Sequence, residues 1–298
     1  MAADDVVVSA GPFQLAEGPV WDAARDRLLW VDIYAGTVHE GVLDGAEVVP
    51  RRVLHRSDGM VGAVAVAEDG TLLVAEQEVL ATVGTDGTRA EVARVVPAGE
   101  RRRLNDGGTD PAGRFLVGTL SLEQSSGESH RREVLVRLEP DGTLTEIDDD
   151  LGLSNGLAWT GDGRRMFSTD TDRRTVFVRD YDVATGTVGE RRTHLRLEEG
   201  SPDGCAIDAE DHLWVAVFGA GQVRRYRPDG ALVATIEVPA PHTTSVAFAG
   251  DDLRTLVVTT GRVELDDEGR RTHPLSGHLF TARTDVPGRP APAWRGLG

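Results

Sequence analysis

Oxygen-bearing side chains recur at nearly even intervals along this chain. They stand at the start of similar apolar stretches, at Glu17, Asn105, Asn155 and Asp203. Carboxylate and carboxamide oxygens, without cysteine or histidine, favour Ca²⁺, with Mg²⁺ or Mn²⁺ next. Zn²⁺ can occupy such a site but usually prefers nitrogen or sulfur ligands. Buried carboxylates repel one another and resist desolvation, so a site that gathers these side chains needs a cation.

The stretches that follow these residues are copies of an internal repeat. Each copy has three or four apolar residues, a tight polar turn and a second apolar run, and the copies start at Glu17, Val61, Asn105, Asn155, Asp203 and Ser245. Successive starts lie about 42 to 50 residues apart, which leaves room for four strands and almost none for a helix. Such units are typical of propeller blades. The sequence therefore predicts an all-β, six-bladed β-propeller of four-stranded antiparallel blades around a central channel, as a single domain over residues 1–298.

Closure of the ring is predicted from the two ends of the chain. Val6, Val7 and Val8 form an apolar run that we expect to pair with the last blade beside residues 277–284. This pairing would remove two exposed sheet edges. A propeller places equivalent residues around one axis, so the six repeat starts should form a ring. Any one Asn or Asp could simply cap a turn, but four oxygen ligands among six equivalent positions favour the cation site. Residues 121–132 are expected to form a long exposed loop.

Composition narrows the classes of function. The net charge of −17 argues against nucleic acid or an anionic membrane surface as a partner. The chain has no lysine, which removes Schiff-base chemistry and a Walker-type phosphate site. Cys205 is its single cysteine, so no disulfide framework is expected. Without a signal-like or membrane-spanning segment, we expect a cytoplasmic protein, a monomer or weak oligomer acting on a small molecule.

At these same residues the sequence resembles a known family. The segments are LAEGPVWD, RLNDGGTDPAGRFLVGTL, LSNGLAW and PDGCAIDAEDHLWVA, and they follow one another between about Phe13 and Phe280. Together they are similar to the senescence-marker-protein/gluconolactonase family, which includes regucalcin. The resemblance implies a six-bladed propeller with one divalent metal and a lactonase activity, that is, a carboxylic ester hydrolase of carbohydrate metabolism that opens a small aldonolactone.

The resemblance also implies roles for individual residues. The metal ligands would be Glu17, Asn155 and Asp203, and the substrate contacts would be Arg103, Asn105 and Glu123. Hydrolysis of a lactone needs a base for the attacking water, and Asp203 is the best candidate because the two asparagines cannot accept a proton at neutral pH. The metal would polarise the carbonyl.

Two other functions remain open from the sequence. One is an organophosphate-type phosphotriesterase, and the other is a non-catalytic calcium-binding propeller. The sequence also contains the motif G-x-S-x-G at residues 152–156. This motif would suggest a nucleophilic Ser154 only if it lay between a strand and a helix. Here the residues that follow predict a β-hairpin, so Ser154 is not expected to be a nucleophile.

Overall fold

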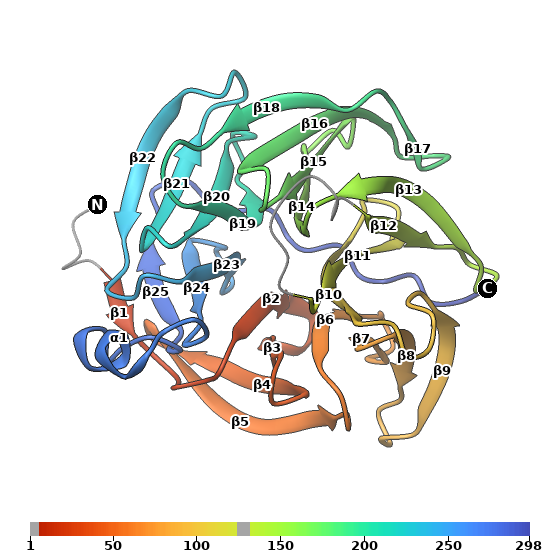
Figure 1. Ribbon diagram of the computed structural model, residues 1–298, viewed down its shortest axis with the longest axis horizontal. Helices are drawn as coiled ribbons and strands as arrows, with labels where there is room; N and C mark the ends of the chain where they lie inside the picture. Colours follow the sequence, from red (N-terminus) through yellow and green to blue (C-terminus); the bar gives the residue numbers. More distant parts are fainter. Residues whose placement is uncertain (1–5, 124–131) are drawn as a thin grey trace.

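The computed structural model describes residues 6–123 and 132–298. Six antiparallel sheets stand around a central axis like the blades of a propeller, and the chain passes through them in order (Figure 1). This arrangement confirms the predicted six-bladed β-propeller. Among the described residues the one α-helix is α1 (Asp267–Thr272), and no helix is long and apolar enough to cross a membrane.

Each blade begins at the axis and ends at the rim. The first has β2 (Ala16–Asp22), β3 (Arg27–Asp32), β4 (Thr37–Asp44) and β5 (Glu47–Arg56), with a 3₁₀ turn at Ala23–Arg25. The second has β6 (Val61–Val66), β7 (Leu72–Glu76), β8 (Val79–Val83) and β9 (Arg89–Arg94). The third has β10 (Arg102–Thr109), β11 (Phe115–Ser121), β12 (Glu133–Leu138) and β13 (Leu144–Leu151). The fourth has β14 (Ser154–Trp159), β15 (Arg165–Asp170) and β16 (Thr175–Asp182), whose outer partner is split into β17 (Thr187–Val188) and β18 (Arg192–Arg196). The fifth has β19 (Ser201–Ile207), β20 (Leu213–Phe218), β21 (Gln222–Tyr226) and β22 (Leu232–Glu237), and the sixth has β23 (Thr243–Ala249), β24 (Thr255–Thr260), β25 (Phe280–Arg283) and β1 (Val6–Val8).

The last blade is built from both ends of the chain. Strand β1 pairs antiparallel with β25, with Val6 opposite Ala282 and Val8 opposite Phe280. The predicted pairing of the N-terminal valines with the last blade is therefore confirmed. It holds the sixth blade to the first and leaves the ring without a gap.

The hydrophobic core lies in layers between neighbouring blades. Trp30 is fully buried, and Trp214 of the fifth blade meets Phe248 of the sixth edge to face, with ring centroids 5.9 Å apart. Edge-to-face contact is a favoured geometry for aromatic pairs. Because each layer joins two sheets, packing holds the blades at a constant angle to one another.

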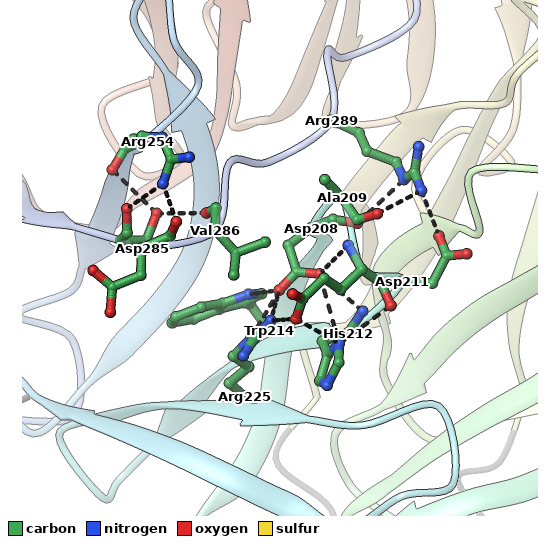
Figure 2. Close-up of polar contacts among 12 residues, drawn as sticks. Asp208, Ala209, Asp211, His212, Trp214, Arg225, Arg254, Asp285, Val286 and Arg289 are labelled. Atoms are coloured by element: carbon green, nitrogen blue, oxygen red, sulfur yellow. Dashed lines mark hydrogen bonds and ion pairs between the residues drawn. The ribbon is translucent and has the colours of Figure 1, made fainter.

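After β25 the chain crosses the end of the channel at which the innermost strands finish. We call residues 285–298 the C-terminal strap. Figure 2 shows Arg289 of the strap donating hydrogen bonds to the carbonyl of Ala209 and to Asp211, in the turn between β19 and β20. The base of that turn is held by the buried carboxylate of Asp208, which accepts hydrogen bonds from Trp214 Nε1 at 2.9 Å and Arg225 Nε at 2.8 Å (Figure 2).

Further along, the strap is anchored between the second and third blades. The Trp294 amide donates to the carbonyl of Val66 at 2.8 Å, and the Arg295 amide donates to that of Gly113 at 2.9 Å. The Trp294 side chain is 3% exposed and lies in the core between these blades. The strap thus links the sixth, fifth, second and third blades, a role that the sequence did not indicate.

Replacing Trp294 with alanine should therefore destabilise the whole ring. Loss of a buried tryptophan costs about 3–5 kcal/mol, because the cavity left behind is only partly filled. Urea denaturation measures the change. Leu297→Ala is the matched control, because Leu297 lies in the same strap but is 44% exposed. Equal effects of the two substitutions would show that the strap is not an anchor.

Candidate metal and substrate site

Every innermost strand carries a one-residue β-bulge near the same end of the channel. The bulges fall between Glu17 and Val20, Val61 and Ala63, Leu104 and Gly107, Asn155 and Leu157, Pro202 and Cys205, and Thr243 and Ser245. A bulge inserts one unpaired residue, bends the strand and re-aims a side chain. The bulges therefore mark the level at which side chains of all six blades turn toward a common point.

The strand register also identifies which residues are equivalent. Aligned from the hairpin turn of each blade, the ring positions are Glu17, Gly62, Asn105, Asn155, Asp203 and Ser245. The predicted ring was correct in five blades and wrong by one residue in the second, where it named Val61. Apolar runs in the sequence align equally well with either choice, because only the pairing of the strands shows which residue is extra.

Glycines beside the ring let neighbouring strands approach closely. A Cβ on Gly62 would lie 2.1 Å from the carbonyl oxygen of Asn105, and one on Gly156 would lie 2.4 Å from that of Asp203. Both contacts are far too short for any side chain. The glycines therefore allow the ring to be narrow enough to bring side chains of different blades together.

Three buried carboxylates lie within reach of one another's charge at this level. Burial raises the pKa of Glu17 well above its ordinary value, and the charges of Asp203 and Asp106 raise it further. Burial likewise raises the pKa of Asp203, with Asp106 adding to the effect, and raises the pKa of Asp106 to about 6. Each of these carboxylates is costly to ionise in the ion-free protein.

Asp106 is the site residue that the sequence reasoning missed. Its carboxylate accepts a hydrogen bond from the Gly107 amide at 2.8 Å. A signal was present: the ring residues Glu17, Asn155 and Asp203 are each followed by glycine, whereas Asn105 is followed by an acid. Three other blades have glycine, which has no side chain, at the position of Asp106. An acid at this position indicates that the channel has room for a side chain there.

Arg103 is the positive group of the site. It is 3% exposed, and its Nη1 donates to Asn105 Oδ1 at 2.7 Å. Burial lowers the pKa of Arg103 to about 10, while interactions with Tyr34, Glu17 and Asp203 act in the opposite direction. It therefore stays protonated at neutral pH. Three ionised carboxylates and one guanidinium leave two negative charges, which one divalent cation would balance.

Hydrogen bonds orient the two asparagines of the ring. Asn105 Nδ2 donates to the carbonyl of Ser154 at 2.9 Å, so the third blade is tied to the fourth. Asn155 Nδ2 donates to Thr171 Oγ1 at 3.2 Å, and the carboxamide also hydrogen-bonds to the Asp203 carboxylate. The side-chain oxygen of Asn155, Oδ1, accepts one long hydrogen bond of 3.3 Å from the Gly156 amide.

The donor set fits a cation with oxygen ligands. Asp203 Oδ1 is buried and has no hydrogen-bond partner among the described residues. An unpaired carboxylate oxygen in this position is costly unless a positive group binds it. Within the described part of the chain, no three His, Cys, Asp or Glu side chains converge as a metal centre. A site built on Glu17 and Asp203 would need a further oxygen ligand, and the predicted one is the carboxamide of Asn155.

Glu123 is not part of the buried group. It lies just beyond the end of β11, is exposed, and borders residues 124–131, which are outside the described residues. Its amide donates to Ser121 Oγ at 3.1 Å. A contact of Glu123 with the substrate stays a prediction, and so does most of the expected exposed loop at 121–132.

Ser154 is buried at the start of the hairpin formed by β14 and β15. This setting is not the strand-to-helix turn that a G-x-S-x-G nucleophile needs, and the predicted β-hairpin is confirmed.

A cavity of about 620 Å³ fills the channel on the other side of the ring. Its walls include alanine and valine residues of the inner strands, and strap residues 289–293 line its far end. Asp106 also lines it, so this carboxylate stands between the ring and the cavity. Asp22, Arg25 and Glu68 add charged side chains to the lining.

Comparison with known proteins agrees with this geometry. Residues 15–262 match the family model described as the SMP-30/gluconolactonase/LRE-like region. The chain belongs to this family. It is 36% identical over 284 residues to the pentonolactonase XacC of Haloferax volcanii, covering 93% of each chain, and 34% identical over 272 residues to regucalcin of Danio rerio, covering 90% of each. A solved structure from Agrobacterium tumefaciens, described as a calcium-binding protein, regucalcin, superposes with a TM-score of 0.90 at 29% identity, over 99% of this chain and 98% of that one.

A methyl group at position 62 should disturb the ring without touching any site side chain. In Gly62→Ala the new Cβ meets the backbone of β10, so one of the two strands must shift. Overpacking of this kind costs about 1–3 kcal/mol, and we expect weaker Ca²⁺ binding as well. Denaturation and calorimetric titration measure the two effects. The control Gly189→Ala places its Cβ 3.3 Å from the nearest atom and should leave Ca²⁺ affinity unchanged.

The raised carboxyl pKa values predict an unusual dependence of stability on pH. Between the ordinary carboxyl pKa and the raised one, the folded ion-free protein holds protons that the unfolded chain has lost. Stability therefore falls as the pH rises through this window, which for Asp106 ends near its pKa of about 6. Unfolding of chelator-treated protein should become easier as the pH rises from about 4 to about 6, and saturating Ca²⁺ should reduce that slope. Identical slopes with and without Ca²⁺ would contradict the charge cluster.

Proposed function

We propose that this protein is a divalent-cation-dependent lactonase that opens a small sugar-type lactone. The observation that carries the proposal is the buried ring of oxygen ligands, whose net charge and unpaired Asp203 oxygen suit one cation. Arg103 and Asn105 beside it offer hydrogen bonds to a hydroxylated ligand. A relative that is 36% identical over nearly the whole chain is named a pentonolactonase, which supports the choice of substrate class.

Glu17, Asn155 and Asp203 would hold the cation. Their oxygens favour Ca²⁺, and the calcium-binding description of the regucalcin structure supports it; Zn²⁺, Mg²⁺ or Mn²⁺ are the alternatives. When bound, the ion supplies Lewis acidity to the carbonyl oxygen of the lactone.

Asp203 is the proposed general base. Lactone hydrolysis requires a water to lose a proton as it attacks the carbonyl carbon, and a positioned carboxylate accepts it. In the ion-free protein burial raises the pKa of Asp203, so this base needs nearby positive charge to be ionised at neutral pH. Arg103 supplies one such charge and the cation another.

Arg103 and Asn105 would bind the substrate. Arg103 Nε is buried and has no hydrogen-bond partner among the described residues, although Nη1 is engaged by Asn105. A free guanidinium N–H suits the hydroxyls of an aldonolactone. A purely structural ion would need no such donor. A cytoplasmic location and a monomeric or weakly oligomeric state remain predictions from the sequence.

Substitution of Asp203 tests the function. Asp203→Ala should reduce the rate of aldonolactone opening by at least about 10²–10⁴, because it removes the base and a cation ligand together. Chelation of the wild-type protein should do the same and be reversed by added Ca²⁺. Asp229→Ala, on an exposed turn, is the control and should keep full activity.

The assay should include paraoxon beside the aldonolactones. Cation-dependent turnover of paraoxon alone would point to a phosphotriesterase. Cation binding without turnover of any compound would point to a non-catalytic calcium-binding propeller. Full lactonase activity after chelation would refute the proposed mechanism.

A further inference from the structure

A tight turn stands at the ring end of the channel between the first two blades. It joins β3 to β4, and the Gly36 amide closes it on the carbonyl of Ile33 at 3.1 Å, which places Tyr34 at the tip. Ile33 is tied to both neighbouring inner strands: its amide donates to the carbonyl of Leu15 at 2.9 Å, and its carbonyl accepts from Val61 at 3.2 Å. Val61 directly precedes Gly62, and Leu15 lies two residues before Glu17. Tyr34 is therefore anchored at the rim of the site.

The turn is rigid. Gly36 has a φ of +63°, and a Cβ there would lie 2.3 Å from the carbonyl oxygen of Gly59. The backbone on which Tyr34 stands is thus packed against the connection to the second blade and has one conformation available. An aromatic ring on such a base can present a fixed surface to a ligand.

The Tyr34 side chain has no role in the fold. It is 45% exposed, whereas the other two tyrosines, Tyr181 and Tyr226, are buried in the core. Among the described residues its hydroxyl has no hydrogen-bond partner. The charged group that interacts with it is the guanidinium of Arg103, from the third blade.

Gly62 explains how groups of the first and third blades come together. The second blade contributes this glycine to the ring, so its ring position has no side chain. Tyr34 interacts electrostatically with Arg103, whose Nε is buried without a hydrogen-bond partner among the described residues. Together they form an aromatic face and two hydrogen-bonding groups.

We propose that Tyr34 is a specificity-determining residue that selects polyhydroxylated lactones over unsubstituted ones. Its ring would pack on the C–H face of the substrate, and its hydroxyl would hydrogen-bond to a ring hydroxyl that Arg103 also contacts. This inference rests on the proposed lactonase function. It concerns recognition only, because Tyr34 stands at the rim and neither Asp203 nor the other proposed cation ligands need it.

The test compares two substrates. KM and kcat are measured at saturating Ca²⁺ for an aldonolactone and for unsubstituted γ-butyrolactone, with wild type, Tyr34→Phe and Tyr34→Ala. In Tyr34→Ala the substrate loses a hydrogen bond and its contact with the aromatic ring of Tyr34, which should raise KM for the aldonolactone by about 3- to 10-fold. KM for γ-butyrolactone should not rise, and Tyr34→Phe should fall between wild type and Tyr34→Ala on the aldonolactone. Leu232→Ala, at a residue 51% exposed on the outer strand β22, is the control and should match wild type.

The outcomes separate the two proposals. If wild type opens both lactones and Tyr34→Ala keeps the wild-type ratio of their KM values, the inference is wrong while the lactonase function stands. If wild type opens neither lactone with any divalent cation, the proposed function is wrong and the inference falls with it. A lowered melting temperature of Tyr34→Ala would also overturn the inference, since it would give Tyr34 a structural role.

Discussion

Repulsion between buried carboxylates is the interaction on which the rest of this structure depends. Glu17, Asp106 and Asp203 come from three different blades and are held within reach of one another's charge. Folding must overcome that repulsion, because bringing like charges out of water is unfavourable. The hydrophobic layers between blades provide the opposing free energy. A closed ring makes this possible, since no blade can move outward without opening all the others.

Two devices close the ring, and they act at different places. Strand β1 completes the sixth blade at its outer edge, and the strap that carries Trp294 crosses the end of the channel farthest from the site. The strap also borders the cavity behind Asp106. The ring end carries the connections between the second and third strands of each blade, such as the turn of Tyr34. This division agrees with the general observation that binding residues lie on loops held by a rigid scaffold.

The β-bulges convert a repetitive scaffold into an asymmetric site. All six inner strands have one extra residue, yet the ring positions hold an acid, an amide, a glycine or a serine depending on the blade. Blades with glycine at or beside the ring allow close approach, and the third blade, with Asp106, adds a charge instead. Symmetry of the backbone thus brings the residues to one level, and differences between blades determine what that level can bind.

Much of this could be read from the sequence. The period of the repeat determined the number of blades, the apolar N-terminal run determined the partner of the last blade, and the repeat placed Glu17, Asn105, Asn155 and Asp203 at equivalent positions. These features depend on local patterns that repeat, so the chain itself carries them. Tertiary structure decided the rest. Which residue of a bulge is unpaired depends on the neighbouring strand, so Gly62 could not be distinguished from Val61. The contributions of Asp106, Tyr34 and the strap arise from contacts between blades far apart in sequence, and no spacing along the chain encodes them.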